Sequence, residues 1–233
     1  WPPAEADSGP LTRNLALAGI GGLLLALLVG GVRERMHNVV RSRDDLEHDL
    51  NLPALGVVPR LSGPREIAAE LRDPRSVYAE AHHSIAVALD QATAGGLPKT
   101  LLITSSTASE GKSTSAWGIA RSLSAMGRRV LVVDADLRRA SKRKGSAPGL
   151  SEVLEGSTPA QEAVQTREGA GFSVICAGEV RTSPVALLST DQMKDTLERL
   201  SQDHDIVIID GPPIIGLADA VLLARSAEAV LVV

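Results

Sequence analysis

A run of residues suited to binding phosphate follows a short apolar segment at residues 100–104. It reads Ser109-Glu110-Gly111-Lys112-Ser113-Thr114 and leads into a helix that we expect over residues 116–126. In a phosphate-binding loop, backbone N–H groups surround the phosphates at a helix N-terminus, a lysine contacts the β- and γ-phosphates, and the next hydroxyl binds Mg²⁺. Gly111, Lys112 and Ser113 match this pattern, although Ser106 stands where a leading glycine is usual.

Carboxylates stand at the ends of two further apolar segments. Residues 130–133 are followed by Asp134 and Asp136, and residues 206–209 are followed by Asp210. Carboxylates at i and i+2 of an extended chain project to one side, where they can orient magnesium-bound water or an attacking group. A single Asp at a strand end is often a turn or cap residue. Three such ends in this order, one of them carrying Gly-Lys-Ser, favour a phosphoryl-transfer site instead.

The elements that must position these residues alternate between strands and helices. Five short runs show little alternation of polarity, as strands covered on both faces do; they are residues 100–104, 130–133, 172–175, 206–209 and 230–233. Helical stretches separate them, which is typical of an α/β fold with a doubly wound, mainly parallel sheet. Ligands of such sheets bind beyond the carboxyl ends of the strands. The candidate residues all follow a strand, so we predict a sheet of the P-loop NTPase type.

A long apolar segment, residues 14–32, precedes this domain and contains no charged residue. As a helix it would measure about 28 Å at roughly 1.5 Å per residue, close to the hydrocarbon core of a bilayer, about 30 Å. Arg13 precedes it, whereas four arginines follow it, at positions 33, 35, 41 and 43. The positive-inside rule therefore places residue 33 onward in the cytoplasm. Small residues line one face every four positions and favour helix self-association; they are Ala18, Gly22, Ala26 and Gly30.

These features divide the chain into four parts. Residues 1–13 are an extracytoplasmic, proline-containing remnant, residues 14–32 a transmembrane helix, residues 33–75 a juxtamembrane cytoplasmic linker, and residues 76–233 a nucleotide-binding domain that is incomplete at its C-terminus. Within the linker we expect a helix over residues 33–50. Prolines bracket residues 52–59, which predicts an extended segment. Another helix is expected over residues 76–91.

Composition argues against several other classes of protein. The net charge is −4 and aromatic residues make up 2% of the chain, so binding of nucleic acid through phosphates or base stacking is not expected. Cys176 is the only cysteine, which excludes an intramolecular disulfide and a multi-cysteine zinc site. We expect the side chain of Cys176 to be buried.

Together these motifs resemble those of the bacterial tyrosine kinases, the autokinases attached to polysaccharide co-polymerases of capsule and exopolysaccharide export. Gly111-Lys112-Ser113 is similar to the family's Walker A motif, Asp134-Ala135-Asp136-Leu137-Arg138 to its additional Walker A′ motif, and Asp210-Gly211-Pro212-Pro213 to Walker B. Residues 52–59 and 149–154 also match, as do Ala177-Gly178 followed by residues 184–188. The resemblance covers almost the whole chain, as a fragment with the last transmembrane helix and most of the cytoplasmic kinase domain.

This resemblance implies that ATP and Mg²⁺ bind at the carboxyl edge of the sheet and that the γ-phosphoryl group passes to tyrosine hydroxyls. Residues 109–114 would bind ATP, with Lys112 neutralising phosphate charge. Asp136 would polarise the attacking hydroxyl, while Asp134 and Asp210 complete the magnesium shell, partly through water. The predicted catalytic set is Lys112, Asp134, Asp136 and Arg138, and the predicted metal set is Ser113, Asp136 and Asp210.

The sequence departs from the family on one helix and in its tyrosines. The family's ring-forming helix carries a glutamate followed by two arginines at three-residue steps, but Glu80 is followed here by His83 and Ala86. This difference puts octameric assembly in question. His82 and His83 are expected on a solvated helix face. Tyr78 is the only tyrosine, which leaves little for autophosphorylation within these residues.

Two other functions stay open on the sequence. A partition or cell-division-site ATPase shares the aspartate-rich core, but such proteins carry a second lysine early in the loop, where Thr107 stands here. A chain-length regulator whose nucleotide site only switches oligomeric state is the non-enzymatic alternative. The family resemblance implies an inner-membrane location with the nucleotide domain in the cytoplasm. Its implied partners are further copies of the chain, the polysaccharide polymerisation and export machinery, tyrosine-containing protein substrates and a cognate phosphatase.

Overall fold

A computed structural model describes residues 9–35, 52–61, 63–92, 96–140, 148–166 and 169–233. The chain forms two compact units, residues 1–54 and residues 55–233. The first unit contains helix α1 (Gly9–Arg35). Its residues 13–31 are long and apolar enough to cross a membrane; their mean hydropathy is 2.0, and none of this segment is buried. The predicted transmembrane segment 14–32 is therefore helical. Most of the helix predicted over residues 33–50 lies outside the described residues.

The second unit is built on one sheet with the strand order β3-β4-β2-β5-β1-β6. Its strands are β1 (Thr100–Thr104), β2 (Val130–Asp134), β3 (Gln165–Thr166), β4 (Ser173–Ile175), β5 (Ile206–Asp210) and β6 (Ala229–Val232). All neighbouring pairs are parallel except β3 and β4. The predicted mainly parallel sheet is confirmed. Each of the five predicted strands corresponds to an observed one, whereas the short antiparallel edge strand β3 was not predicted.

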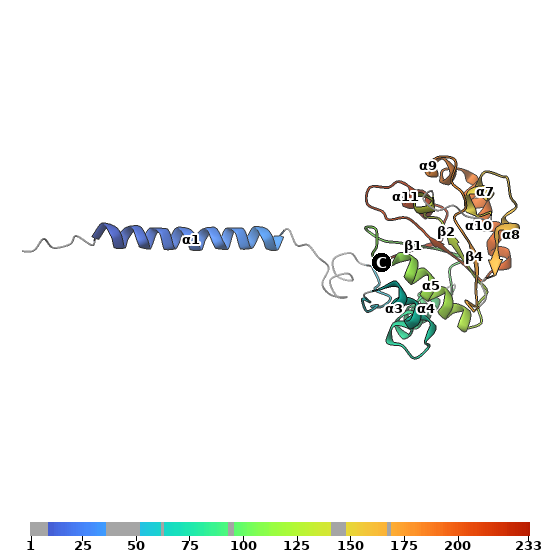
Figure 1. Cartoon of the computed structure of the whole chain (residues 1–233), viewed down its shortest axis with the longest axis horizontal. Helices are drawn as coiled ribbons and strands as arrows, with labels where there is room; N and C mark the ends of the chain where they lie inside the picture. The colour runs from blue at the N-terminus through green and yellow to red at the C-terminus, as the bar shows by residue number, and fades with distance from the viewer. Residues whose placement is uncertain (1–8, 36–51, 62, 93–95, 141–147, 167–168) are drawn as a thin grey trace, which may run out of the picture. The chain divides into compact units, whose positions relative to one another are not determined.

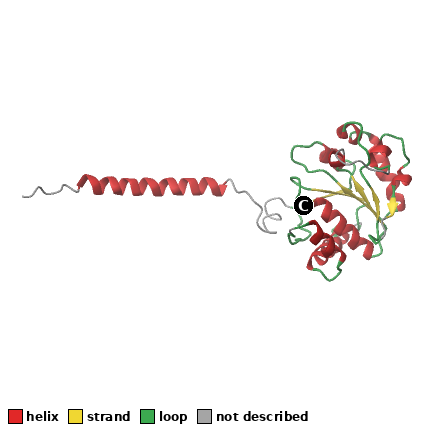
Figure 2. Ribbon diagram, in the orientation of Figure 1, coloured by secondary structure: helices red, strands yellow, loops and turns green. Residues whose placement is uncertain are grey.

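Helices cover both faces of this sheet (Figures 1 and 2). On one face lie α3 (Pro64–Arg72), α4 (Val77–Gln91) and α5 (Lys112–Ala125). On the other lie α7 (Leu150–Leu154), α8 (Ala160–Ala163), α9 (Pro184–Leu188), α10 (Asp191–Asp203) and α11 (Asp219–Ala224), while the short α6 (Leu137–Ala140) follows β2. Alternate strand residues divide the core accordingly, so that Leu102 belongs to one buried cluster and Leu101 and Ile103 to the other.

The segment predicted as a linker contains residues that pack against the domain. Residues 52–61 have neither helix nor strand, as the bracketing prolines predict. Leu55 and Val58 nevertheless pack against the buried cluster that includes Ile85 of α4, and a Cβ on Gly56 would come within 2.7 Å of Ile85. The helix α3, which was not predicted, follows and contacts α4. The compact unit therefore begins at Leu55, ahead of the predicted domain start at residue 76.

Helix α4 differs from the expectation for its two histidines. His83 is exposed, but His82 is fully buried and lies against α5, where a Cβ on Gly118 would come within 2.3 Å of its ring. Adjacent residues on a helix point about 100° apart, so one of the two faces inward. The prediction of a solvated face is wrong for His82. Ala86, at a position where the family has an arginine, is also fully buried.

Candidate active site

The phosphate-binding loop connects β1 to α5 at the carboxyl edge of the sheet. Gly111 has φ = 105°, the left-handed region that glycine adopts without strain, and α5 begins at the next residue, Lys112. The helix thus starts four residues earlier than predicted. Ser109 also has a positive φ, 69°. The loop therefore turns sharply and ends at a helix N-terminus, where unpaired N–H groups and the helix dipole favour anions.

Lys112 lies against the carboxylate of the second strand-end motif. Its Nζ is 3.2 Å from Oδ2 of Asp136, and the side chains are only 6% and 11% exposed. Oδ1 of Asp136 also accepts a hydrogen bond from the Arg139 amide at 3.3 Å, and the Asp136 amide donates to Oδ1 of Asp134 at 3.2 Å. The predicted Walker A and Walker A′ motifs therefore meet in space through Lys112 and Asp136.

Asp210 brings the third motif to the same place. The strand pair β2–β5 sets Asp134 beside Asp210, and the Ser113 hydroxyl donates a hydrogen bond to the Asp210 carboxylate. Asp210 is 5% exposed, and its Oδ1 has no hydrogen-bond partner. Burial raises the pKa of Asp210 to about 6; the nearby charges of Asp134 and Asp136 add to this, while Ser113 and Lys112 oppose it. Burial also raises the pKa of Asp134.

Hydrogen bonds to backbone carbonyls join the segments that carry the three motifs. The Ala135 amide donates to the Asp210 carbonyl at 2.9 Å, and the Thr104 hydroxyl donates to the Pro212 carbonyl at 2.7 Å. The amides of Ile214 and Ile215 donate to the carbonyls of Ser105 and Ser106, at 2.9 and 3.0 Å. The segment after β5 thus runs along the phosphate-binding loop.

The remaining predicted site residues are placed less centrally. Glu110 is exposed and accepts hydrogen bonds from the amide and hydroxyl of Thr107, both at 2.8 Å. Arg138 forms an ion pair with Asp219, a residue that sequence reasoning missed. The two lie 81 positions apart, so no local pattern joins them. Cys176 follows β4 and is exposed, which contradicts the prediction of a buried side chain; it lies on a loop beyond the strand end.

A metal site made only of protein side chains is not found among the described residues, which contain no group of three or more His, Cys, Asp or Glu suited to a metal ion. Magnesium in phosphoryl-transfer sites is usually held by one or two carboxylates together with water and substrate phosphates. The unpartnered Oδ1 of Asp210 and the adjacent Ser113 hydroxyl fit that arrangement.

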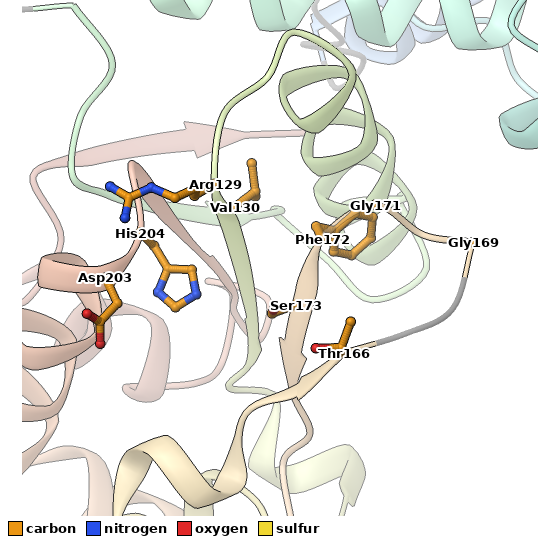
Figure 3. A pocket seen from close by; sticks show the side chains of 9 residues that line it. All are labelled: Arg129, Val130, Thr166, Gly169, Gly171, Phe172, Ser173, Asp203 and His204. Atoms are coloured by element: carbon orange, nitrogen blue, oxygen red, sulfur yellow. The ribbon is translucent and has the colours of Figure 1, made fainter.

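A surface pocket of about 470 Å³ lies at the opposite end of the strands (Figure 3). Residues that precede or begin β2, β4 and β5 line it, among them Arg129, Val130, Phe172, Ser173, Asp203 and His204. None of the predicted site residues lines this pocket.

Comparisons with known proteins agree with the motifs. Residues 99–233 match the model of a family described as an AAA domain. A tyrosine-protein kinase, ptk, of Acinetobacter johnsonii is 30% identical over 92% of this chain, which spans 31% of that protein. The tyrosine-protein kinase YwqD of Bacillus subtilis is 32% identical, and the alignment covers 68% of each chain. The chain belongs to the bacterial tyrosine-protein kinases.

Solved structures of this family share the fold. The kinase domain of the Escherichia coli tyrosine kinase ETK superposes with a TM-score of 0.73 at 27% identity, covering 84% of this chain and 82% of that one. The BceF tyrosine kinase domain gives 0.69 at 29% identity, covering 82% and 84%. The part of the chain that superposes therefore has the fold of a bacterial tyrosine kinase domain. Phosphoryl-transfer sites on P-loop folds bind nucleotide phosphates together with magnesium.

Proposed function

We propose that this chain is the membrane-anchored catalytic part of an ATP-dependent protein-tyrosine kinase that transfers the γ-phosphoryl group of ATP to tyrosine hydroxyls. The observation that carries the proposal is the convergence of Lys112, Ser113, Asp136 and Asp210 at one buried edge, with one carboxylate oxygen left without a partner. Burying several carboxylates around one lysine is unfavourable for stability. Such groups are typical of functional sites.

In this proposal the residues at this edge have separate roles in phosphoryl transfer. The amides after Gly111 bind the phosphates, and Lys112 neutralises their charge. Ser113 and Asp210 would hold Mg²⁺, together with Asp134 or Asp136 through water, and the ion would neutralise charge on the β- and γ-phosphates. Asp136 accepts a hydrogen bond from the tyrosine hydroxyl and then its proton. The tyrosine oxygen forms a bond to the γ-phosphorus while the bond to the bridging oxygen breaks, releasing ADP.

The acceptor tyrosine lies outside these 233 residues. Tyr78 is the only tyrosine, and it is 7% exposed on α4, where its ring packs against His82 at a centroid distance of 4.8 Å. Burial also raises the pKa of its hydroxyl. A side chain held in this way does not reach the carboxyl edge of its own domain, so phosphorylation requires a substrate from elsewhere.

Helix α1 and the family resemblance support the cellular setting that we propose. The helix anchors the protein in the bacterial inner membrane, with the nucleotide-binding domain in the cytoplasm. Its substrates and partners are tyrosine-containing proteins, the machinery of capsule or exopolysaccharide polymerisation and export, a phosphatase that reverses the reaction, and further copies of the chain. Self-association uses the small-residue face of α1 and surfaces of the kinase domain.

The test is phosphotyrosine formation on a poly(Glu,Tyr) copolymer by the full chain in lipid nanodiscs, supplied with ATP and Mg²⁺. We expect Lys112→Met to reduce the rate by orders of magnitude, because charge neutralisation dominates this chemistry. Lys194→Met is the matched control, since Lys194 is 64% exposed in a loose pair with Glu198. Full activity of Lys112→Met would contradict the proposal. Release of inorganic phosphate without phosphotyrosine would instead indicate an ATPase, and ATP binding without turnover a regulator.

A further inference from the structure

Arg138 and Asp219 form a two-bond ion pair beside the proposed catalytic residues. Nε of Arg138 donates to Oδ2 of Asp219 at 2.5 Å, and Nη2 donates to Oδ1 at 3.0 Å. Two parallel bonds from the planar guanidinium fix both the distance and the orientation of the side chain. The pair therefore constrains the backbone that carries Arg138 more than a single contact would.

The two partners are exposed to different degrees. The Asp219 side chain is 2% exposed, whereas that of Arg138 is 42% exposed. A buried carboxylate needs a charged partner to stay ionised at low cost. Asp219 is also the first residue of α11, where the helix dipole favours a negative charge. Asp219 is thus a fixed anchor, and Arg138 is the side chain that it holds.

The anchor is itself connected to the phosphate-binding loop. The segment that leads from β5 to α11 is hydrogen-bonded through Ile214 and Ile215 to the carbonyls of Ser105 and Ser106. At its far end stands Asp219. The ion pair therefore closes a ring of contacts that runs from the phosphate-binding loop, along this segment, to the residues after β2.

The residues after β2 are the ones that the reaction needs. Arg138 lies two positions after Asp136, in the short helix α6, whose start is capped by the Asp136 side chain through the Arg139 amide. Hydrogen bonding to Asp219 raises the pKa of Arg138, and the Asp136 charge adds to this. A change in the position of Arg138 would therefore change the position and the electrostatic environment of Asp136.

We propose that Asp219 is a positioning residue for phosphoryl transfer: it holds Arg138, and through Arg138 the loop of residues 134–138, in the arrangement in which Asp136 meets Lys112. In this assignment Arg138 acts through the ion pair and not through contact with the phosphates. The inference rests on the proposed function, because it concerns the same site.

The experiment compares Asp219→Asn, Asp219→Glu and Arg138→Lys in the full chain in nanodiscs. Asp219→Asn keeps the shape but removes the charge, and Arg138→Lys keeps the charge but removes the two-bond geometry. With ATP and poly(Glu,Tyr) we expect both to lower kcat about 10- to 100-fold, as small misplacements of catalytic groups do, with KM for ATP within about threefold of wild type. Asp219→Glu should recover part of the loss, because it restores the carboxylate.

Asp205→Asn is the matched control. Asp205 also pairs with an arginine, Arg129, at 2.8 Å, but at the amino edge of the sheet. It should leave kcat unchanged. Hydrogen exchange of the amides of residues 135–139 gives a second readout that does not depend on activity; it should become faster in Asp219→Asn and stay unchanged in Asp205→Asn.

The inference and the proposed function fail in different ways. If wild type forms phosphotyrosine and Asp219→Asn keeps at least half of its kcat, the positioning role is wrong. It is equally wrong if exchange at residues 135–139 is the same in Asp219→Asn as in wild type, whether or not the chain is active. Absence of phosphotyrosine in wild type, with faster exchange in Asp219→Asn, would contradict the proposed function and leave the positioning of the loop supported.

Discussion

At the carboxyl ends of β2 and β5, Lys112 and Asp136 form an ion pair whose side chains are 6% and 11% exposed; at the amino ends, Arg129 and Asp205 form one whose side chains are 62% and 33% exposed. The strands are the same, but the environments differ. Asp205 has its pKa lowered to about 2, mainly by the Arg129 side chain. Asp210 has its pKa raised to about 6, mainly by burial.

This difference in burial and in pKa indicates that the carboxyl edge, rather than the amino edge, is the candidate active site. At the amino edge one carboxylate faces one guanidinium in a partly solvated pair, and such pairs contribute little to stability. At the carboxyl edge Asp134, Asp136 and Asp210 are gathered around Lys112, and one carboxylate oxygen has no partner. A protein keeps such an unfavourable cluster where a ligand completes it. Among the described residues, those that line the pocket at the amino edge include one carboxylate, Asp203, and so form no comparable cluster.

The largest expected effect is that of Asp136→Asn. Asparagine has nearly the same shape but cannot accept the tyrosine proton, so kcat should fall by about 10²- to 10⁴-fold, the usual contribution of a general base. Binding of ATP should change far less. Steady-state kinetics with poly(Glu,Tyr), together with titration of a fluorescent ATP analogue, separate the two quantities. A kcat within tenfold of wild type would show that Asp136 does not take the proton.

A smaller effect is expected for Glu152→Gln. This variant changes a carboxylate whose oxygens both accept hydrogen bonds within the domain. Glu152 accepts hydrogen bonds from the Gly149 amide at 2.8 Å, the Glu179 amide at 2.9 Å and the Ser151 hydroxyl at 3.0 Å. In the glutamine variant an NH₂ group would face one of these amides. We expect a loss of about 1 kcal/mol in the free energy of unfolding, reduced by partial exposure, with kcat nearly unchanged.

The pH dependence of Glu152→Gln checks the assignment. Burial pushes the pKa of Glu152 upward, but hydrogen bonds from the Glu179 and Gly149 amides outweigh it, so the pKa is lowered. A lowered pKa means that the stabilisation is present above the unfolded value, about 4.3, and is lost as the pH falls below it. Urea unfolding followed by Trp117 fluorescence should show the difference at pH 7 and a smaller one near pH 3. A difference that grew on acidification would contradict this account.

The smallest effect belongs to Asp205→Asn at the amino edge. Because Arg129 is exposed and Asp205 is only half-buried, we expect only a small loss of stability and no change in kcat. The pKa of Asp205 is lowered to about 2, so the contribution is present above about pH 4 and disappears as the pH falls towards 2. Chemical-shift titration of the Asp205 carboxyl measures this directly. A midpoint near 4 would mean that the ion pair does not form in solution.

Much of the fold was predictable because β1, β2 and β5, the strands that precede the candidate site residues, are continuous apolar runs. Residues 100–104 match β1, and residues 130–133 and 206–209 match β2 and β5 to within one residue. The candidate residues follow these strands, so parallel pairing alone brings Lys112, Asp136 and Asp210 together. Helix α3 had signals that could have revealed it, since Pro64 stands at its first turn, Glu66 in that turn and Arg72 in its last.

Other features depend on contacts between distant segments. The pairing of Arg138 with Asp219 and the burial of His82 against Gly118 are decided by packing between elements, which leaves no local pattern. The edge strand β3 consists of Gln165 and Thr166, two polar residues that are too few to show a period. Exposure of Cys176 follows from where β4 ends, a boundary that sequence reasoning places less reliably than the strand itself.

The most direct test of the account is the unfolding free energy of wild type and Asp210→Asn as a function of pH, with and without Mg²⁺ and ATP. The pKa of Asp210 is raised to about 6 in the folded chain and is about 3.9 when unfolded, so the ionised carboxylate destabilises the ligand-free fold as the pH rises from 4 through 6. Removing it should therefore stabilise the ligand-free chain by about 1–3 kcal/mol at pH 7.5 and by almost nothing near pH 3, where the carboxyl is protonated in both states. Saturating Mg²⁺ and ATP should stabilise wild type more than the variant. A variant that is less stable than wild type at pH 7.5 without ligand, or that gains as much from Mg²⁺ and ATP, would contradict the claim that this carboxylate is held in place for magnesium and nucleotide.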